Sequence, residues 1–414
     1  MKILILTQYF PPEIGAPQNR LFELAIRLKE KGNDITVLTA MPNYPQMKIH
    51  EKYSGKFRHY EEMDGLKVFR SWIFVSKSKS IFMRLLNYFS FTWTSFWSGL
   101  LRVGKPDIII CESPPLFLGI SAYLLKKIKR AKLVFNVSDL WPESAEKLGL
   151  VTNNLFLGIA KSLEEFLYKH SELVTGQTQG IVKNISSRFP EKKTYWLPNG
   201  VDLNYYDSSA ALSGWRKEKG FSDDDFILLY AGIIGHAQGL EIILRSAQLL
   251  SHNSKIKFIL LGNGPEKDSL LSMKEKMNLS NIFFYDAVSK KEMPFIISAS
   301  NASIIPLKRL DLFKGAIPSK IFESLAMQKA ILLGVEGEAK DLFIEEGKCG
   351  LAFEPENEKA LTEKILILYN DRKLLAELGA NGRNYVNLKF NRNIIAENLQ
   401  KVLISLFPSP SRTE

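Results

Sequence analysis

The sequence predicts an α/β fold with two doubly wound, Rossmann-like parallel-sheet domains that face each other across a cleft. The chain of 414 residues is longer than a domain with a single hydrophobic core usually is, which favours two domains of about 200 residues each. Short apolar runs alternate with segments of helical periodicity through both halves. A break rich in turn residues, LPNGVD at 197–202, separates the halves. We therefore expect domains at 1–200 and 201–390.

The first domain is predicted to alternate strands with helices. Apolar residues recur at helical spacing in residues 18–31, where Gly32 ends the helix, and again near 116–130. Strands are expected at residues 2–7, 34–39, 107–111, 133–137, 172–175 and 194–197. Because helices separate most of these strands, the sheet should be parallel.

The second domain repeats this pattern. Strands are expected at residues 226–231, 256–261, 281–284, 302–305 and 330–333, with helices near 240–250, 266–277, 291–297, 319–327 and 358–370. A last helix within 391–407, amphipathic from Asn393 to Phe407, follows the complete second domain. We expect it to pack back on the first domain.

No metal site and no cofactor are expected. Cys111 and Cys349 lie far apart, which excludes a disulfide framework and fits a reducing cytosol. The five histidines show no metal-ligand spacing. Three aspartates at 223–225 precede a strand and so lie at the sheet edge opposite to the ligand-binding edge. The apolar run after Met1 is too short for a signal peptide, which favours a cytoplasmic protein.

The net charge of +11 favours an anionic partner. Nucleic acid is not favoured, because no nucleic-acid-binding motif accompanies the charge. Residues 66–105 contain seven Lys or Arg, ten aromatic residues and no acid, and Leu85–Leu101 carries no charge at all. We interpret this segment as an interfacial helix on an anionic membrane, with its contacts at Arg84, Tyr88, Trp93 and Trp97. A buried helix pair is one alternative, and a membrane span at the lower length limit is another.

Glycine-containing loops follow two predicted strands of the second domain. Gly232 and Gly235 follow the first of these strands, and Gly262 and Gly264 follow the second. Glycine lets the backbone approach a bound group, and a helix start offers free N–H groups to an anion. The pattern favours a phosphate-binding edge, although ordinary loops share it.

The segment IPSKIFESLAM at 317–327 begins another predicted helix. Lys320 and Glu323 lie one turn apart on it, and Ser319 precedes them. An ammonium and a carboxylate placed in this way suit a phosphate and a sugar hydroxyl, although a surface ion pair has the same spacing. With Ser319 as N-cap, Glu323 is at position N4 and cannot close a capping box, which favours a ligand role.

Two loops of the first domain carry further candidates. The loop Thr7–Arg20 has Gly15 and Ala16 ahead of a helix, and it either covers a diphosphate or simply connects strand and helix. Asp139 follows a buried strand, where it either contacts a sugar or acceptor hydroxyl or caps the next helix.

The chain to about Phe407 resembles family-four glycosyltransferases of the GT-B fold, from the branch that builds bacterial surface polysaccharides. The resemblance rests on six motifs in order: TQYFPPEIGAPQNR, DLWPES, LPNGVD, YAGIIGHAQGLE, LGNGP and IPSKIFESLAMQKAIL. Within the branch the chain is most similar to fucosamine-type amino-sugar transferases.

This resemblance implies a retaining, metal-independent transfer of an amino or deoxy sugar in O-antigen, capsule or exopolysaccharide synthesis. The donor would be a nucleotide-diphosphate sugar, usually UDP-linked in this branch, held by the second domain. The acceptor would be a lipid-diphosphate-linked sugar on the side of the first domain. The enzyme would act peripherally on the inner face of the bacterial plasma membrane.

The resemblance also assigns residues. Glu323 matches the ribose-binding glutamate, and Gly15 and Ala16 match the glycine pair beside the diphosphate. Gly315 replaces a second family glutamate, for which Asp311 or a backbone group would substitute. Ile233 and Gln238 replace a basic pair, so Lys320 becomes the first choice for neutralising the diphosphate, with Lys308, Arg309 and Lys314 as alternatives.

The resemblance thus gives a set of expected residues. The expected catalytic residues are Asp139, Lys320 and Glu323, and the expected donor-binding residues are Gly15, Ala16, Gly232, Gly235, Gln238, Gly262, Gly264, Ser319, Lys320 and Glu323. Two rival functions stay open, a GT-B-like sugar-nucleotide epimerase and a non-enzymatic membrane scaffold.

Overall fold

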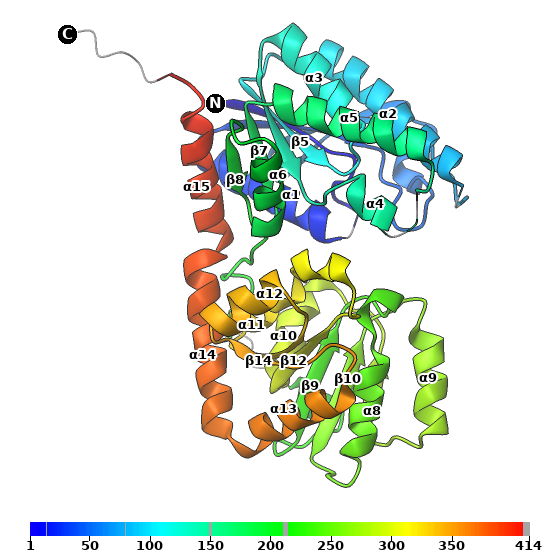
Figure 1. Ribbon diagram of the computed structural model, residues 1–414, viewed down its shortest axis with the longest axis vertical. Helices are drawn as coiled ribbons and strands as arrows, with labels where there is room; N and C mark the ends of the chain where they lie inside the picture. The colour runs from blue at the N-terminus through cyan, green and yellow to red at the C-terminus, as the bar shows by residue number, and fades with distance from the viewer. Residues whose placement is uncertain (14, 79, 148, 150, 210–213, 409–414) are drawn as a thin grey trace, which may run out of the picture. The chain divides into compact units, whose positions relative to one another are not determined.

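The computed structural model describes residues 1–13, 15–78, 80–147, 149, 151–209 and 214–408. The chain divides into two compact units (Figure 1). The first unit consists of Met1–Asn199 with Arg392–Glu414, and the second of Gly200–Asn391. Each unit has one sheet with helices on both faces, which confirms the predicted pair of doubly wound α/β domains.

The sheet of the first unit has the strand order β3-β4-β2-β1-β5-β6-β7-β8. Only β3 runs antiparallel to its neighbour β4. The strands are β1 Lys2–Leu6, β2 Asp34–Ala40, β3 Arg58–Met63, β4 Leu66–Ser71, β5 Ile108–Ser113, β6 Lys132–Val137, β7 Leu173–Gly176 and β8 Thr194–Trp196.

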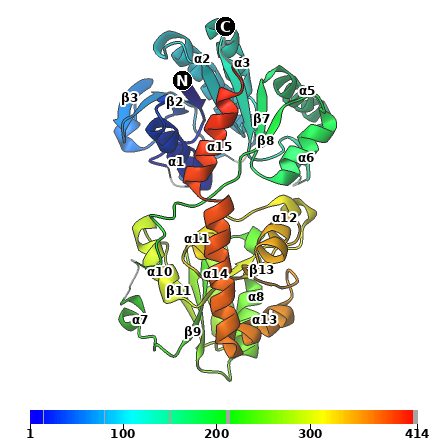
Figure 2. The same cartoon turned by 90° about the vertical axis from the view of Figure 1, so that its left-hand side faces the viewer.

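Helices cover both faces of this sheet (Figure 2). They are α1 Ala16–Glu30, α2 Ile81–Arg102, α3 Leu118–Lys129, α4 Glu143–Lys147, α5 Asn154–His170, α6 Gln179–Arg188 and α15 Arg392–Ile404. Ile3 and Ile5 share one core with residues of α1 and α15, whereas Leu4 and Leu6 face α2, α3, α5 and α6. The side chains of β1 therefore alternate between two cores, as a strand buried on both faces requires.

The sheet of the second unit is parallel throughout, with the order β11-β10-β9-β12-β13-β14. Its strands are β9 Phe226–Ala231, β10 Ile256–Leu261, β11 Ile282–Tyr285, β12 Ala302–Pro306, β13 Ala330–Gly334 and β14 Gly350–Ala352. Its helices are α7 Trp215–Glu218, α8 Glu241–Leu249, α9 Lys267–Lys276, α10 Met293–Ala299, α11 Lys320–Ala326, α12 Glu338–Lys340, α13 Glu358–Asn370 and α14 Arg372–Lys389.

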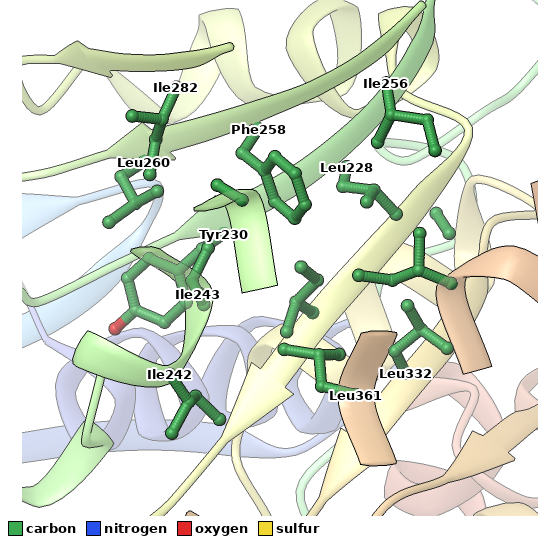
Figure 3. Close-up of a cluster of buried hydrophobic side chains, with 14 of the residues drawn as sticks. Leu228, Tyr230, Ile242, Ile243, Ile256, Phe258, Leu260, Ile282, Leu332 and Leu361 are labelled. Carbon is green, nitrogen blue, oxygen red and sulfur yellow. The ribbon is translucent and has the colours of Figure 1, made fainter. Parts of the chain in front are cut away.

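One face of this second sheet packs a continuous hydrophobic core (Figure 3). Leu228 and Tyr230 of β9 and Phe258 of β10 point into it, and Ile243 of α8 and Leu361 of α13 cover them. This burial fixes the strands in register, so that their carboxyl ends form one edge.

The structure contains elements that the sequence pattern did not predict. The β3–β4 hairpin occupies residues 58–71, inside and before the basic aromatic segment, and β14 and α14 were also missed. The segment Leu85–Leu101 lies in the single helix α2, so the alternative of a buried helix pair is wrong. In the part of the chain that the structure describes, no helix has both the length and the apolar character needed to cross a bilayer.

Two of the seven basic residues in this segment pair with acidic residues from outside it. Arg70 is fully buried and bonds to Glu61 with an Nε–Oε1 distance of 2.6 Å. Lys67 pairs with Asp34 at 3.0 Å. A third, Lys79, lies outside the described residues. The predicted set of uncompensated cations was therefore too large.

Candidate functional site

The loops after β9 and β10 touch each other at the carboxyl edge of the second sheet. Gly232 and Gly262 have φ angles of +145° and +146°, which L side chains rarely adopt. A Cβ at Gly262 would collide with the carbonyl oxygen of Gly232, and one at Gly264 with that of Ile234. Glycine is therefore needed at positions 262 and 264 for packing, because it allows the two loops to make backbone contact.

Lys320, at the first turn of α11, reaches under the β9 loop. Its ammonium lies 3.8 Å from the ring centroid of Tyr230. A Cβ built on Gly232 would stand 3.0 Å from the Lys320 Nζ, so glycine is needed there for the lysine to approach the loop backbone. The Tyr230 hydroxyl donates a hydrogen bond of 2.5 Å to the carbonyl oxygen of Ile233. Tyr230 thus supports both the cation and the loop.

Burial lowers the pKa of Lys320 to about 7, and the Glu323 carboxylate opposes this shift. The ammonium is therefore close to its titration point at neutral pH. A polyanion bound beside it would restore the charged form and raise this pKa.

We expect the affinity for a nucleoside diphosphate to fall as the pH rises above about 7. Only the protonated lysine attracts the anion, and above its free-state pKa each binding event must first take up a proton. Titration calorimetry of UDP between about pH 7 and pH 9 measures this dependence. A Lys320→Ala variant serves as the control and should show a flat profile. Equal affinity for the wild type across this range would contradict a role of Lys320 as the anion-binding cation.

Glu323 follows Lys320 by one turn of α11, and both side chains are half-buried. The N-cap Ser319 makes no side-chain capping bond. Glu323 and Lys320 line a small cavity of about 10 Å³ together with Ala231, the last residue of β9, and Ile305 near the carboxyl end of β12. The structure thus brings the predicted cation and carboxylate to the carboxyl edge of the sheet.

A larger cavity of about 560 Å³ opens beside the ends of β10 and β11. Trp215 and Tyr285 form part of its wall, with their ring centroids 5.6 Å apart. The two cavities adjoin each other at helix α10, because Ile296 lines the larger one and Ile297 the smaller one. A cavity of this size with aromatic walls suits a nucleoside.

The remaining predicted donor-binding residues of this unit lie in the β9 loop. Gly235 precedes the short 3₁₀ turn His236–Gln238, and the backbone N–H of Gln238 donates to the Gly235 carbonyl oxygen at 3.2 Å. The imidazole Nδ1 of His236 lies 2.8 Å from a carboxylate oxygen of Glu266. His236, like Tyr230, was not singled out by the sequence pattern.

The alternative cations differ in their surroundings. Lys308 lies against the β9 loop, since its backbone N–H donates to the carbonyl oxygen of Ala237 at 2.9 Å. Arg309 pairs with Glu354 at 2.8 Å, and Lys314 pairs with Asp311 at 2.7 Å. Lys308 is therefore the better second candidate for an anion. Asp311, the suggested substitute for the missing family glutamate, is engaged by Lys314.

In the first unit, Gly15 is the N-cap of α1 and Ala16 its first residue. The neighbouring Ile14 lies outside the described residues. Buried Glu13 anchors this loop, because its carboxylate accepts hydrogen bonds from the backbone N–H groups of Asn43 and Tyr44 at 2.7 and 2.8 Å. Sequence reasoning passed over Glu13, which stabilises the loop that holds the Gly15–Ala16 pair.

Asp139 follows β6 and is exposed. Its carboxylate accepts a hydrogen bond of 2.7 Å from the hydroxyl of Ser144. This is a side-chain contact, so the alternative in which Asp139 is the N-cap of a helix is not what the structure shows.

A buried polar network fixes the loop that carries Asp139. Arg20 of α1 pairs with Glu112 of β5 at 2.5 Å and donates to the Ser138 hydroxyl at 2.7 Å. Asn136 and the Ser138 hydroxyl also donate to Glu112. A buried carboxylate satisfied by three donors holds its neighbours rigidly. These residues hold Ser138, which directly precedes Asp139, and the motif that ends at Arg20 did not indicate this network.

Among the described residues, no group of three or more His, Cys, Asp or Glu side chains gathers in a way that would hold a metal ion. The triple aspartate at 223–225 precedes β9, where Asp225 accepts from the Ser222 backbone at 2.8 Å and Asp224 lies 3.4 Å from Lys255. This is the edge of the sheet opposite to Lys320.

Comparison with known proteins matches both halves of the chain to family models. Residues 18–205 match Glycosyltransferase Family 4, and residues 213–385 match Glycosyl transferases group 1. A putative colanic acid biosynthesis glycosyl transferase of Escherichia coli K12 is 28% identical over 88% of this chain and 91% of its own length.

Two further similarities are more distant. An N,N'-diacetylbacillosaminyl-diphospho-undecaprenol alpha-1,3-N-acetylgalactosaminyltransferase of Campylobacter jejuni is 24% identical over 69% of this chain and 68% of its own length. The crystal structure of Anabaena HepE with UDP and glucose superposes with a TM-score of 0.69 at 17% identity, covering 98% of this chain and 100% of the other. The chain is therefore a glycosyltransferase of the GT-B fold, with a family 4 domain in its first half and a group 1 domain in its second half.

Proposed function

We propose that this enzyme transfers a sugar, with retention of anomeric configuration, from a nucleotide-diphosphate donor to a lipid-linked acceptor in the synthesis of a bacterial surface polysaccharide. The observation that carries the donor half of this proposal is the Lys320 ammonium, desolvated between Tyr230 and the Gly232 backbone at the carboxyl edge of the second sheet. A buried cation at a ligand-binding edge needs an anion.

The donor nucleotide would lie along this edge. Its base would occupy the larger cavity beside Tyr285, and its ribose hydroxyls would bond to Glu323. The diphosphate would lie at Lys320, where negative charge develops as the glycosidic bond breaks. A fixed cation at the leaving group lowers the barrier, because it is worth more in the transition state than in the ground state.

The relatives support the choice of substrates. The name of the E. coli relative refers to colanic acid biosynthesis, and that of the Campylobacter relative specifies a sugar carried on diphospho-undecaprenol. The Anabaena structure of the same fold holds UDP and glucose. We therefore propose a UDP-linked amino or deoxy sugar as donor and a sugar on a lipid diphosphate as acceptor.

Helix α2 supports a membrane-bound location. Its large apolar side chains form one exposed stripe at helical spacing, with Phe82 and Trp93 exposed by 62% and 64%; the stripe consists of Phe82, Leu86, Phe89, Trp93, Trp97 and Leu101. The opposite face packs on the protein core through Phe91 and through small polar side chains, since Ser95 bonds to Ser121 and Ser98 to Ser71. The helix thus presents a second apolar stripe away from the core, as an interfacial helix does.

Further apolar residues extend this surface. Leu124 and Ile128 of α3 and Leu155 and Ile159 of α5 are exposed, and α2, α3 and α5 cover the same face of the sheet (Figure 1). Exposed cations such as Arg84 add attraction to anionic headgroups. We propose that this face lies on the inner surface of the plasma membrane.

Replacing Trp93 and Trp97 by serine should release the protein from anionic liposomes. The exchange removes two exposed aromatic side chains that would enter the headgroup zone and leaves the buried face of α2 unchanged. Co-sedimentation at low and high salt measures the binding. A Trp215→Phe variant, altered in the second unit, is the control. A wild type that stays in the supernatant with anionic liposomes at low salt would contradict the proposed location.

Activity should survive EDTA, because Lys320 and backbone N–H groups would neutralise the diphosphate without a metal ion. Transfer of labelled sugar is measured with and without the chelator. Loss of transfer in EDTA, restored by Mg²⁺ or Mn²⁺, would show that a metal ion carries the leaving group.

One assay separates this function from the two rivals. Donor turnover is followed with and without a lipid-linked acceptor. A glycosyltransferase consumes donor and labels the lipid only when the acceptor is present. An epimerase converts the donor in either case without labelling lipid, and a scaffold leaves the donor intact while still binding liposomes.

A further inference from the structure

A further cavity, of about 240 Å³, lies in the first unit. Its walls come from the N-terminal part of α2, the loop between β5 and α3, the loop between β6 and α4, and the start of α5. It is thus formed only by residues of one unit. None of the residues expected to bind the donor lines it, although Asp139 does.

The lining is apolar and aromatic over most of its area. Phe117 is its centre, with ring centroids 5.5 Å from Trp141, 6.1 Å from Phe156 and 6.4 Å from Tyr88. Tyr88, which the sequence predicted on the membrane-contacting face, lines this cavity instead, and burial raises the pKa of its hydroxyl. Four aromatic rings around one cavity suit a hydrocarbon chain rather than a free sugar.

Two opposite charges complete the lining. Arg84, one turn before Tyr88 on α2, is exposed and forms no ion pair with the other described residues. Asp139 contributes a carboxylate that Ser144 holds in place at 2.7 Å. A guanidinium suits a phosphate, and a carboxylate suits a sugar hydroxyl. The cavity therefore combines recognition of hydrocarbon, phosphate and hydroxyl groups.

The cavity wall is continuous with the exposed stripe of α2. Phe89 belongs to that stripe, and its ring centroid lies 4.6 Å from that of Phe117. An amphiphile that lies in a bilayer in contact with α2 could thus pass its head region into the cavity without leaving an apolar surface.

We infer that this cavity is the acceptor subsite and that it takes the phosphate-proximal part of a lipid phosphate. The inference rests on the proposed function and adds the place and the chemistry of acceptor recognition. The first carbons of the chain lie among Tyr88, Phe117 and Trp141. Arg84 binds the phosphate, and Asp139 accepts a hydrogen bond from a hydroxyl of the sugar attached to it.

The test uses farnesyl diphosphate as a soluble probe. Farnesol, which has only the hydrocarbon chain, and inorganic diphosphate, which has only the charged group, serve as comparison ligands. Binding is followed by tryptophan fluorescence, since Trp141 lines the cavity. Wild-type enzyme should bind the complete probe at least about tenfold more tightly than either half. Equal binding of farnesol would identify a mere hydrophobic surface, equal binding of diphosphate would identify a simple anion site, and each would overturn the inference.

Variants locate the binding. Arg84→Gln should weaken probe binding about tenfold or more, whereas Lys77→Gln, a matched loss of charge just before α2 and outside the cavity, should not. The Trp93→Ser/Trp97→Ser variant should retain probe binding, which separates the cavity from the stripe. Probe affinity that is unchanged in Arg84→Gln, or lost in the stripe variant, would overturn the inference.

A parallel titration with UDP separates this inference from the proposed function. Arg84→Gln should bind UDP like the wild type, because Arg84 lines neither of the two cavities that we assign to the donor. Wild-type enzyme that binds UDP but not the probe would contradict the acceptor subsite alone. Wild-type enzyme that binds the probe but no nucleoside diphosphate would contradict the proposed donor site while leaving the cavity as a lipid-phosphate site.

Discussion

Replacing Lys320 by alanine should lower kcat about 100-fold or more, as the loss of one fixed transition-state donor does in other enzymes. The ammonium lies beside the Gly232 backbone and over the ring of Tyr230. Water that entered this position in the variant would not supply a positive charge. Without it, the diphosphate would leave from a site with no fixed positive charge. Initial rates with saturating acceptor measure the effect, and circular dichroism shows that the fold is kept.

Lys314→Ala is the matched control for this variant. Lys314 lies in the same unit and also ends in an ammonium, but it is exposed and already paired with Asp311. Its removal should leave kcat near the wild-type value. Near wild-type turnover in Lys320→Ala, with a large loss in Lys308→Ala, would move the leaving-group role to Lys308.

Replacing Glu323 by glutamine should weaken nucleotide binding by roughly 1.5–3 kcal/mol, the range for hydrogen bonds to charged groups. The change keeps the size of the side chain but removes the charge that, in the proposed complex, binds two ribose hydroxyls. It also removes a carboxylate that helps to keep Lys320 protonated. Titration calorimetry with UDP gives the loss directly, and thermal unfolding checks stability.

Glu345→Gln, an exposed acid-to-amide exchange in the same unit, is the control and should not change UDP affinity. A further comparison uses the 2'-deoxy nucleotide. Wild-type enzyme should discriminate against it, and Glu323→Gln should discriminate less. Unchanged UDP affinity in Glu323→Gln would remove this residue from the site.

The central strands were predictable because burial on both faces leaves an unmistakable pattern. Phe226–Ala231 and Ile256–Leu261 are continuous apolar runs bounded by polar residues and glycine, and the structure has β9 and β10 at these bounds. Loops at the carboxyl ends of such strands are where doubly wound folds bind ligands. The sequence alone therefore located the carboxyl edge of the second sheet, where we propose that the donor binds.

Edge elements were not predictable in the same way. β3 and β4 alternate exposed and buried residues, and their charges reflect one solvated face and one buried ion pair of Arg70 with Glu61. In the sequence these charges look like a solvent-exposed or membrane-contacting run. Whether these charges are exposed or buried depends on pairing between residues that are distant in the sequence, and composition does not reveal such pairing.

Helix α14 was missed because Gly379 and Gly382 lie in its interior, where glycine disfavours a helix. The structure gives the reason for both. A Cβ at Gly379 would collide with the carbonyl oxygen of Gln328, and one at Gly382 would stand 2.6 Å from the Leu325 side chain. Close packing of α14 on α11 and the residues that follow it outweighs helix propensity here.

The candidate site likewise contains residues that could be predicted from the sequence and residues that could not. Lys320 and Glu323 were visible through their spacing on one helix. Tyr230 was not, because within an apolar strand an aromatic residue looks like ordinary core, and its contact with Lys320 joins residues 90 positions apart. The cavity around Phe117 was likewise not predictable, since four separate segments build it.

The donor site is tested most directly by titrating wild-type enzyme, Lys320→Ala and Glu323→Gln with the diphosphates of uridine, guanosine, adenosine and thymidine, followed by thermal shift. Ligand that binds only the folded state raises the melting temperature by mass action. UDP should give the largest rise in the wild type, and both variants should lose most of it. A wild type whose melting temperature no nucleoside diphosphate raises, or variants that respond like the wild type, would contradict the donor site at Lys320 and Glu323.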